Sequence, residues 1–246
     1  MKKFFSLVLL ALTACVSYSQ INDDKQEISF TVVDSTEANL KIYYPQFDSI
    51  KLECFNKVTP ESHENAIFCC AAAFTDDWGT EINHDRICGE HSSDGVVYNN
   101  RSLKRNTGAF VYYDNGYYEF VYRPESNREE LLKKMYTASV DGGCAFTQEM
   151  IIHNNRVVKT TRSYENFNRF RALCNYNDRL CIIDSKDVVR FKDFITALND
   201  LGVKEALYMD MGGWDYSWYI ESNLSNPKYI HSGYNPSITN LLVFYK

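Results

Sequence analysis

The residues best suited to chemistry lie where a short apolar strand, Ala206–Met209, ends in a carboxylate, Asp210. Two glycines follow, Gly212 and Gly213. A strand end holds a side chain rigidly, and glycines let backbone N–H groups approach a ligand closely. We therefore predict that Asp210 is a catalytic carboxylate, acting as an acid/base or stabilising a cationic transition state. The alternative is that it only caps the glycine turn.

Two arginines near the start of another predicted strand are candidates for binding an anion. Arg169 and Arg171 alternate with apolar residues, so both fall on one face of that strand. A guanidinium stays charged and binds phosphate through two parallel hydrogen bonds. We predict Arg171 as a catalytic phosphate clamp and Arg169 as its assistant. The alternative is a structural arginine with a solvated head.

An aromatic run after the glycines is suited to sugar binding. Trp214, Tyr216 and Trp218 share one face if the run is extended, and flat rings stack well on the apolar faces of sugars. Packing in the core of a sheet explains the same pattern equally well. Gln148 is a further candidate for donating to a ligand. Asp215, a candidate for substrate binding, and Glu149 and Asp141 are secondary carboxylates, and a solvated charge is the alternative for each.

Two other patterns suggest different chemistry. The predicted loop His84–His91 carries two histidines, an aspartate and a cysteine, but its spacing matches no familiar zinc motif. Cys144 follows two glycines and could be a thiol nucleophile, with His153 as a distant base. We predict no metal and no cofactor, and a cysteine- or metal-dependent hydrolase remains a rival hypothesis.

One cysteine pair follows from hairpin geometry. Two strand-like segments flank Asn177–Asp178, and a two-residue turn there places Cys174 directly opposite Cys181. Facing positions of this kind lie close enough for a disulfide, which we predict here. A turn shifted by one residue would break the register.

The first twenty residues read as an export signal, with Lys2 and Lys3 before an apolar core too short to span a bilayer. The end of this segment resembles either a lipobox that would lipidate Cys15, giving a membrane tether, or an ordinary cleavage site. We expect a single domain over residues 21–246, acting outside the cytoplasm. The formal net charge of −6 argues against a nucleic-acid partner, which would require a basic surface.

The periodicity of the chain predicts an α+β fold with a largely antiparallel sheet and two main helices. One helix begins at the capping box Ser126–Glu129 and ends near Tyr136. The other contains Phe191–Leu198 and ends at Gly202. The predicted strands cover residues 27–33, 38–44, 49–54 and 66–74, with hairpins at 109–122, 146–161 and 171–183, and residues 76–93 are predicted to be a loop.

Four segments in order resemble the phosphodiester glycosidase family, the domain of the mannose-6-phosphate uncovering enzyme and its bacterial relatives. They are Ala71–Phe74, Asp94–Asn100, Arg169–Leu173 and Ala206–Gly213. The last is similar to the family's strand ending in Asp-Gly-Gly-Gly. The resemblance covers roughly residues 66–220.

This resemblance implies an exported hydrolase that removes a sugar, such as N-acetylglucosamine, from a sugar-1-phosphodiester in a glycan or envelope polymer. The chain departs from the family pattern at Met211, where the family has its first glycine, and at Trp214, where it has a serine. It also lacks the family's Asn-Gly near Ala71–Phe74. These departures leave an alternative open, a non-catalytic glycan-binding protein on the same fold.

Overall fold

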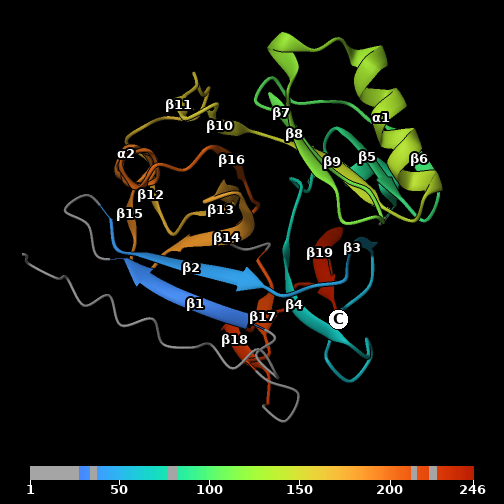
Figure 1. Cartoon of the computed structure of the whole chain (residues 1–246), viewed down its shortest axis with the longest axis horizontal. Coiled ribbons are helices and arrows are strands. Elements are labelled where there is room, and N and C mark those ends of the chain that lie inside the picture. The colour runs from blue at the N-terminus through green and yellow to red at the C-terminus, as the bar shows by residue number, and fades with distance from the viewer. Residues whose placement is uncertain (1–27, 34–37, 77–82, 212–214, 222–225) are drawn as a thin grey trace, which may run out of the picture.

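The computed structural model describes residues 28–33, 38–76, 83–211, 215–221 and 226–246 (Figure 1). In these ranges the chain forms four mostly antiparallel sheets and two α-helices, α1 (Arg128–Val140) and α2 (Phe191–Leu201). The fold is therefore mainly β, and the prediction of one α+β domain was wrong. The predicted export signal, including Cys15, lies outside the described residues.

The largest sheet has seven strands and carries α2 on one face (Figure 1). Its order is β1 (Ile28–Val33), β2 (Leu40–Pro45), β14 (Arg179–Ser185), β13 (Arg171–Tyr176), β16 (Glu205–Tyr208), β10 (Met150–His153) and β11 (Arg156–Val157). The apolar stripe of α2 packs on this sheet, with Phe191, Phe194 and Leu198 fully buried. The helix ends at Gly202, whose φ of 84° is the left-handed conformation that glycine adopts readily.

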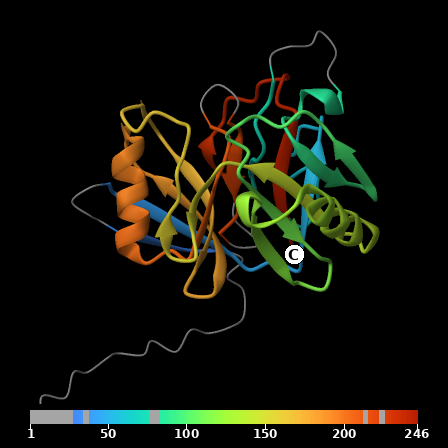
Figure 2. The ribbon, with the colours of Figure 1, turned by 90° about the horizontal axis from the view of Figure 1, so that it is seen from above.

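A five-stranded sheet carries the other helix, on the opposite side of the molecule from α2 (Figure 2). Its order is β6 (Val96–Asn99), β5 (Glu90–Ser93), β9 (Cys144–Gln148), β7 (Gly108–Tyr112) and β8 (Tyr118–Tyr122). Leu131 and Met135 of α1 pack on this sheet. The helix is longer than predicted, and its N-cap is Asn127, whose side chain accepts from the Glu130 N–H at 2.7 Å.

A second five-stranded sheet and a two-stranded ribbon complete the structure. The sheet order is β18 (Lys228–His231), β17 (Ser217–Tyr219), β4 (Ala66–Ala71), β19 (Asn240–Tyr245) and β3 (Ser49–Cys54). The ribbon pairs β12 (Phe167–Asn168) with β15 (Val189–Arg190), and single 3₁₀ turns occur at η1 (His84–Arg86) and η2 (Arg123–Glu125). The three large sheets share one core cluster, to which Phe68, Phe146 and Leu207 each contribute from a different sheet.

The fold class was mispredicted because several short strands lack an apolar pattern. β5, Glu-His-Ser-Ser, lies in the segment predicted to be a loop, yet all four residues are buried. The predicted hairpin over residues 146–161 divides instead. β9 joins the sheet under α1, while β10 and β11 pair in the seven-stranded sheet. Among the described residues, no helix is both long and apolar enough to cross a membrane.

The hairpin of β13 and β14 has the predicted register, but the predicted disulfide is not formed. Cys174 faces Cys181 across the Asn177–Asp178 turn, and both are free thiols. Facing backbone positions are necessary for a bridge, but the Cβ directions and the S–S torsion must also fit. Burial raises the pKa of Cys181 to about 12 and raises that of Cys174 as well, so both thiols stay protonated at neutral pH.

Candidate functional site

Three strand ends from three sheets converge at Asp210. The backbone N–H of Asp210, just beyond β16, donates to the Ala72 carbonyl beyond β4 at 2.9 Å. Gln148, the last residue of β9, donates from its side chain to the same carbonyl at 3.2 Å. The Thr75 N–H donates to Asp210 Oδ2 at 3.3 Å. The segment that follows β4 thus holds both the backbone and the carboxylate of Asp210.

Asp210 is only 6% exposed, and the pKa of its carboxyl group is raised. Burial raises this pKa from 3.8 to about 7, against the opposing effects of the Thr75 and Met211 N–H groups and of two cations, Arg162 and Arg105. A carboxyl group that titrates near neutral pH can take up or release a proton during a reaction. This is the property expected of an acid/base residue.

Two guanidinium groups lie on aromatic rings beside Asp210. The guanidinium carbon of Arg105 lies 4.1 Å from the ring centroid of Phe74, and that of Arg162 lies 4.3 Å from the ring of Tyr208. The two rings are themselves neighbours, with centroids 5.7 Å apart. Cation–π contacts of this kind hold a guanidinium in place without consuming its hydrogen-bond donors.

Both guanidinium groups retain donors for a ligand. Nε of Arg105 is buried, and it has no hydrogen-bond partner among the residues that the structure describes. Arg162 uses Nε for Glu149 Oε2 at 3.4 Å, and within the described ranges its two terminal nitrogens have no hydrogen-bond partner. Buried donors are normally satisfied, so a group like Arg105 Nε indicates a ligand or water position. Two such cations beside one carboxyl group favour an anion as the ligand.

Arg171, the predicted phosphate clamp, is instead part of a buried ion network. It is 0% exposed, and its Nε and Nη2 each bond an Asp184 oxygen at 2.7 and 2.8 Å. Nη1 bonds Asp215 Oδ1 at 2.8 Å, and Nη2 also reaches Ser217 Oγ at 3.2 Å. All its nitrogens are committed to protein groups, and no face is open to a ligand. The geometry gives Arg171 and Asp215 a structural role.

The other predicted binding residues also have structural surroundings. Trp218 is fully buried and donates to the Val58 carbonyl at 2.9 Å, so its ring belongs to the core. The amide oxygen of Gln148 accepts from the Glu149 N–H at 2.9 Å. Its amide nitrogen donates to the Ala72 carbonyl, which also accepts from the Asp210 N–H. Arg169 is exposed and precedes β13, so it does not share a strand face with Arg171. Gly212, Gly213 and Trp214 lie outside the described residues.

The two rival chemistries find little support. His84 and His91 hydrogen-bond each other at 3.0 Å, and the described ranges contain no cluster of metal-ligating side chains. Cys144 is buried, with its pKa raised by burial, and its thiol donates to the Ile50 carbonyl. His153 bonds Glu205 at 2.8 Å and so has another partner.

The sequence interpretation missed both cations of this site. Arg105 lies in a polar segment before β7, and Arg162 lies between β11 and β12. Neither belongs to a recognisable motif, and only the assembled sheets bring them to Asp210. The sequence indicates Glu149 only as a secondary carboxylate, with a solvated charge as the alternative, but the structure buries it fully.

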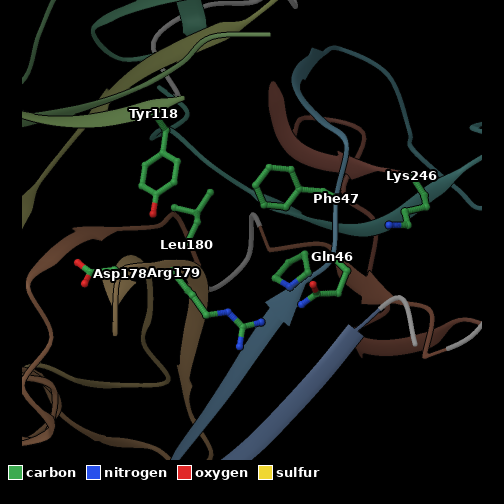
Figure 3. Close-up of a pocket in the computed structure, with 8 residues that line it drawn as sticks. Gln46, Phe47, Tyr118, Asp178, Arg179, Leu180 and Lys246 are labelled. Carbon is green, nitrogen blue, oxygen red and sulfur yellow. The ribbon is translucent and has the colours of Figure 1, made fainter. Parts of the chain in front are cut away.

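A separate open pocket of about 260 Å³ lies at the other end of the β13–β14 hairpin (Figure 3). Leu180, Phe47 and Tyr118 form its apolar part, and Arg179 also lines it, with its guanidinium carbon 4.4 Å from the centroid of the Tyr44 ring. The one carboxylate in its lining, Asp178, is 89% exposed. The pocket therefore lacks the buried acid that distinguishes the Asp210 site.

Comparisons with known proteins agree on the fold. No protein-family model and no curated protein matches the sequence. Among solved structures, the chain is similar to the zebrafish N-acetylglucosamine-1-phosphodiester alpha-N-acetylglucosaminidase catalytic domain auto-inhibited by its pro-peptide. The TM-score is 0.58 at 14% identity, over 89% of this chain and 82% of that chain. It is also similar to a hypothetical protein from Synechocystis, with a TM-score of 0.58 at 11% identity, over 89% of this chain and 62% of that one.

These likenesses define the class of fold. The chain has a fold like that of the zebrafish catalytic domain. At these identities the likeness concerns the fold alone, and the activity has to be argued from the site.

Proposed function

We propose that this protein is a hydrolase that cleaves the glycosidic bond of a sugar-1-phosphodiester. The observation that carries the proposal is the buried carboxyl of Asp210, titrating near neutral pH beside the incompletely paired guanidinium groups of Arg105 and Arg162. A phosphodiester supplies the anion that two cations require, and its sugar supplies the bond that an acid/base residue cleaves.

In this reaction the bond between the sugar C1 and the bridging oxygen breaks, and the electron pair leaves with the phosphate. The negative charge on the phosphate rises as the bond breaks, so the guanidinium groups of Arg105 and Arg162 bind the transition state more tightly than the substrate. A phosphomonoester is a good leaving group and needs no proton. Asp210 then serves as the base that accepts a proton from water while the oxygen of that water bonds to C1.

N-acetylglucosamine is the sugar we propose first, because the zebrafish neighbour is named for that substrate. Export remains part of the proposal and rests on the pattern of residues 1–20, with lipidation of Cys15 as one route to a membrane tether. A glycan or envelope polymer outside the cytoplasm is the corresponding partner.

The test is hydrolysis of a diester in which p-nitrophenyl phosphate is joined to C1 of N-acetylglucosamine. Cleavage at the glycosidic bond gives free sugar and p-nitrophenyl phosphate, whereas cleavage on the other side gives coloured nitrophenol. We expect free sugar from the wild-type protein. Release of nitrophenol alone would place the chemistry at phosphorus and contradict the proposal. No release from a panel of sugar diesters would favour the glycan-binding alternative.

A further inference from the structure

A buried carboxylate lies directly behind one of the two guanidinium groups. Glu149 follows β9, and its side chain is fully buried. Burying an isolated carboxylate is costly, so its partners indicate why it is there. Oε1 accepts from the Thr160 hydroxyl and from the Thr161 N–H at 3.3 Å. Oε2 accepts from Arg162 Nε at 3.4 Å.

Glu149 also holds the ring on which this guanidinium lies. Its backbone carbonyl accepts from the Tyr208 N–H at 2.8 Å. The Tyr208 ring lies 4.3 Å from the guanidinium carbon of Arg162. One residue therefore fixes both members of the cation–π pair, the cation through its side chain and the ring through its backbone.

The segment that carries Arg162 is held at the same point. Thr160 is buried. Its hydroxyl oxygen accepts a hydrogen bond from the Arg162 N–H at 3.0 Å, and its hydroxyl group donates one to Glu149. Every residue from Thr161 to Arg169 except Arg162 is exposed. Glu149 thus holds the guanidinium of Arg162 and Thr160 holds its backbone, whereas the chain from 163 to 169 is exposed.

We propose that Glu149 is a positioning residue that directs the free donors of Arg162 at the anion. This inference rests on the proposed function for the identity of the substrate, but the positioning itself concerns only anion binding. An arginine orients two parallel donors only when its plane is fixed, and Glu149 supplies that constraint through Nε.

The experiment measures inorganic phosphate binding to the full chain by isothermal titration calorimetry. Glu149→Gln keeps the shape of the side chain but removes the charge that orients Arg162. We expect phosphate affinity to fall by about 10-fold to 100-fold, the effect of losing a charge-assisted hydrogen bond. Glu205→Gln is the matched control, because Glu205 is a similarly buried carboxylate that bonds His153 rather than the site, and we expect no change.

A double-mutant cycle separates positioning from general stabilisation. If Glu149 acts through Arg162, then Glu149→Gln has no further effect on phosphate affinity in an Arg162→Gln background. Additive losses, an unchanged affinity in Glu149→Gln, or no phosphate binding by the wild-type protein would each overturn the inference.

A second variant guards against loss of folding. Thr160→Val removes the hydrogen bond to Glu149 and the one from the Arg162 N–H but keeps both charges. We expect a smaller fall in phosphate affinity, of about 3-fold to 10-fold. An unchanged affinity in this variant would also count against the inference. Diester hydrolysis is scored separately. Phosphate binding that depends on Glu149 without hydrolysis would sink the proposed function and leave the positioning role intact.

Discussion

Two arginine–carboxylate clusters lie close together in this molecule, and they differ in how completely their charges are satisfied. Around Arg171, every guanidinium nitrogen bonds a protein oxygen, and the whole cluster is buried. Around Asp210, a carboxyl titrates near pH 7 while the guanidinium of Arg105 has a buried donor without a described partner. The first arrangement is complete within the fold, and the second leaves donors for the ligand that we propose. Incomplete pairing, rather than the presence of an arginine, identifies the candidate site.

The largest effect we predict is on stability, from removing the satisfied arginine. Arg171→Met leaves Asp184 and Asp215 buried without their cation, so the free energy of unfolding should fall by about 3–5 kcal/mol. Urea denaturation measures this. Arg190→Met is the control, because Arg190 pairs with Asp193 at the surface and such pairs contribute about 1 kcal/mol or less. Equal losses of stability from the two substitutions would show that the buried Arg171 network contributes no more to the fold than a surface ion pair.

The second prediction concerns the free energy of unfolding that is lost when the buried Asp210 carboxyl ionises. The folded-state pKa of Asp210, about 7, lies above the value of 3.8 expected in the unfolded chain. The protonated carboxyl therefore contributes its full share of the free energy of unfolding below pH 3.8, and this contribution is lost as pH rises through 7. Asp210→Asn removes this titration and should be more stable than the wild type by about 2–4 kcal/mol at pH 8. At pH 4 the two should unfold alike, and a constant difference across the range would contradict the assigned pKa.

The third prediction concerns the incompletely paired cation. Arg105→Gln should lower kcat/KM for the sugar phosphodiester by about 10-fold to 100-fold, because it removes a charged donor from the anion. The free energy of unfolding should change by less than about 1 kcal/mol, since no described hydrogen bond is lost from the guanidinium. Steady-state kinetics and urea denaturation check the two halves. A large loss of stability would place Arg105 with Arg171 in the structural class.

The fourth prediction is the pH profile of the reaction. As the base, Asp210 must be ionised, so kcat/KM should rise about tenfold per pH unit below 7 and level off above it. The phosphodiester stays singly charged across this range. A profile that falls through pH 7 would assign Asp210 as the acid instead.

The smallest effect is expected from reducing agent. Because Cys174 and Cys181 are free thiols in this structure, dithiothreitol should not change the Tm. A Tm lowered by several degrees would reveal the disulfide that the hairpin register allows, since a native bridge typically contributes a few kcal/mol.

Local features of the site were readable from the sequence. The stripe of α2, its glycine stop, the β13–β14 register and the strand leading to Asp210 all depend on residues close together in the chain. Each is set by helical or alternating periodicity, or by a tight turn. The structure has all four of these features where the sequence predicts them.

The features that failed depend on partners distant in sequence. Whether an arginine is a clamp or a buried counter-ion is decided by Asp184 and Asp215, 13 and 44 residues from Arg171. The role of Arg105 also depends on a residue distant in sequence, because it lies near Asp210 only once the separate sheets have assembled. No periodicity encodes such convergence, so residue type alone favoured Arg171, which the structure places in a buried ion network.

The most direct test of the central claim compares Asp210→Asn with the wild type in hydrolysis of the N-acetylglucosamine phosphodiester at pH 8. Both proteins should be folded there, with the variant the more stable. We predict that the variant loses about 10²-fold to 10⁴-fold of the rate of free-sugar release, the usual contribution of an acid/base residue. Sugar release at the wild-type rate would show that the chemistry lies elsewhere in the molecule.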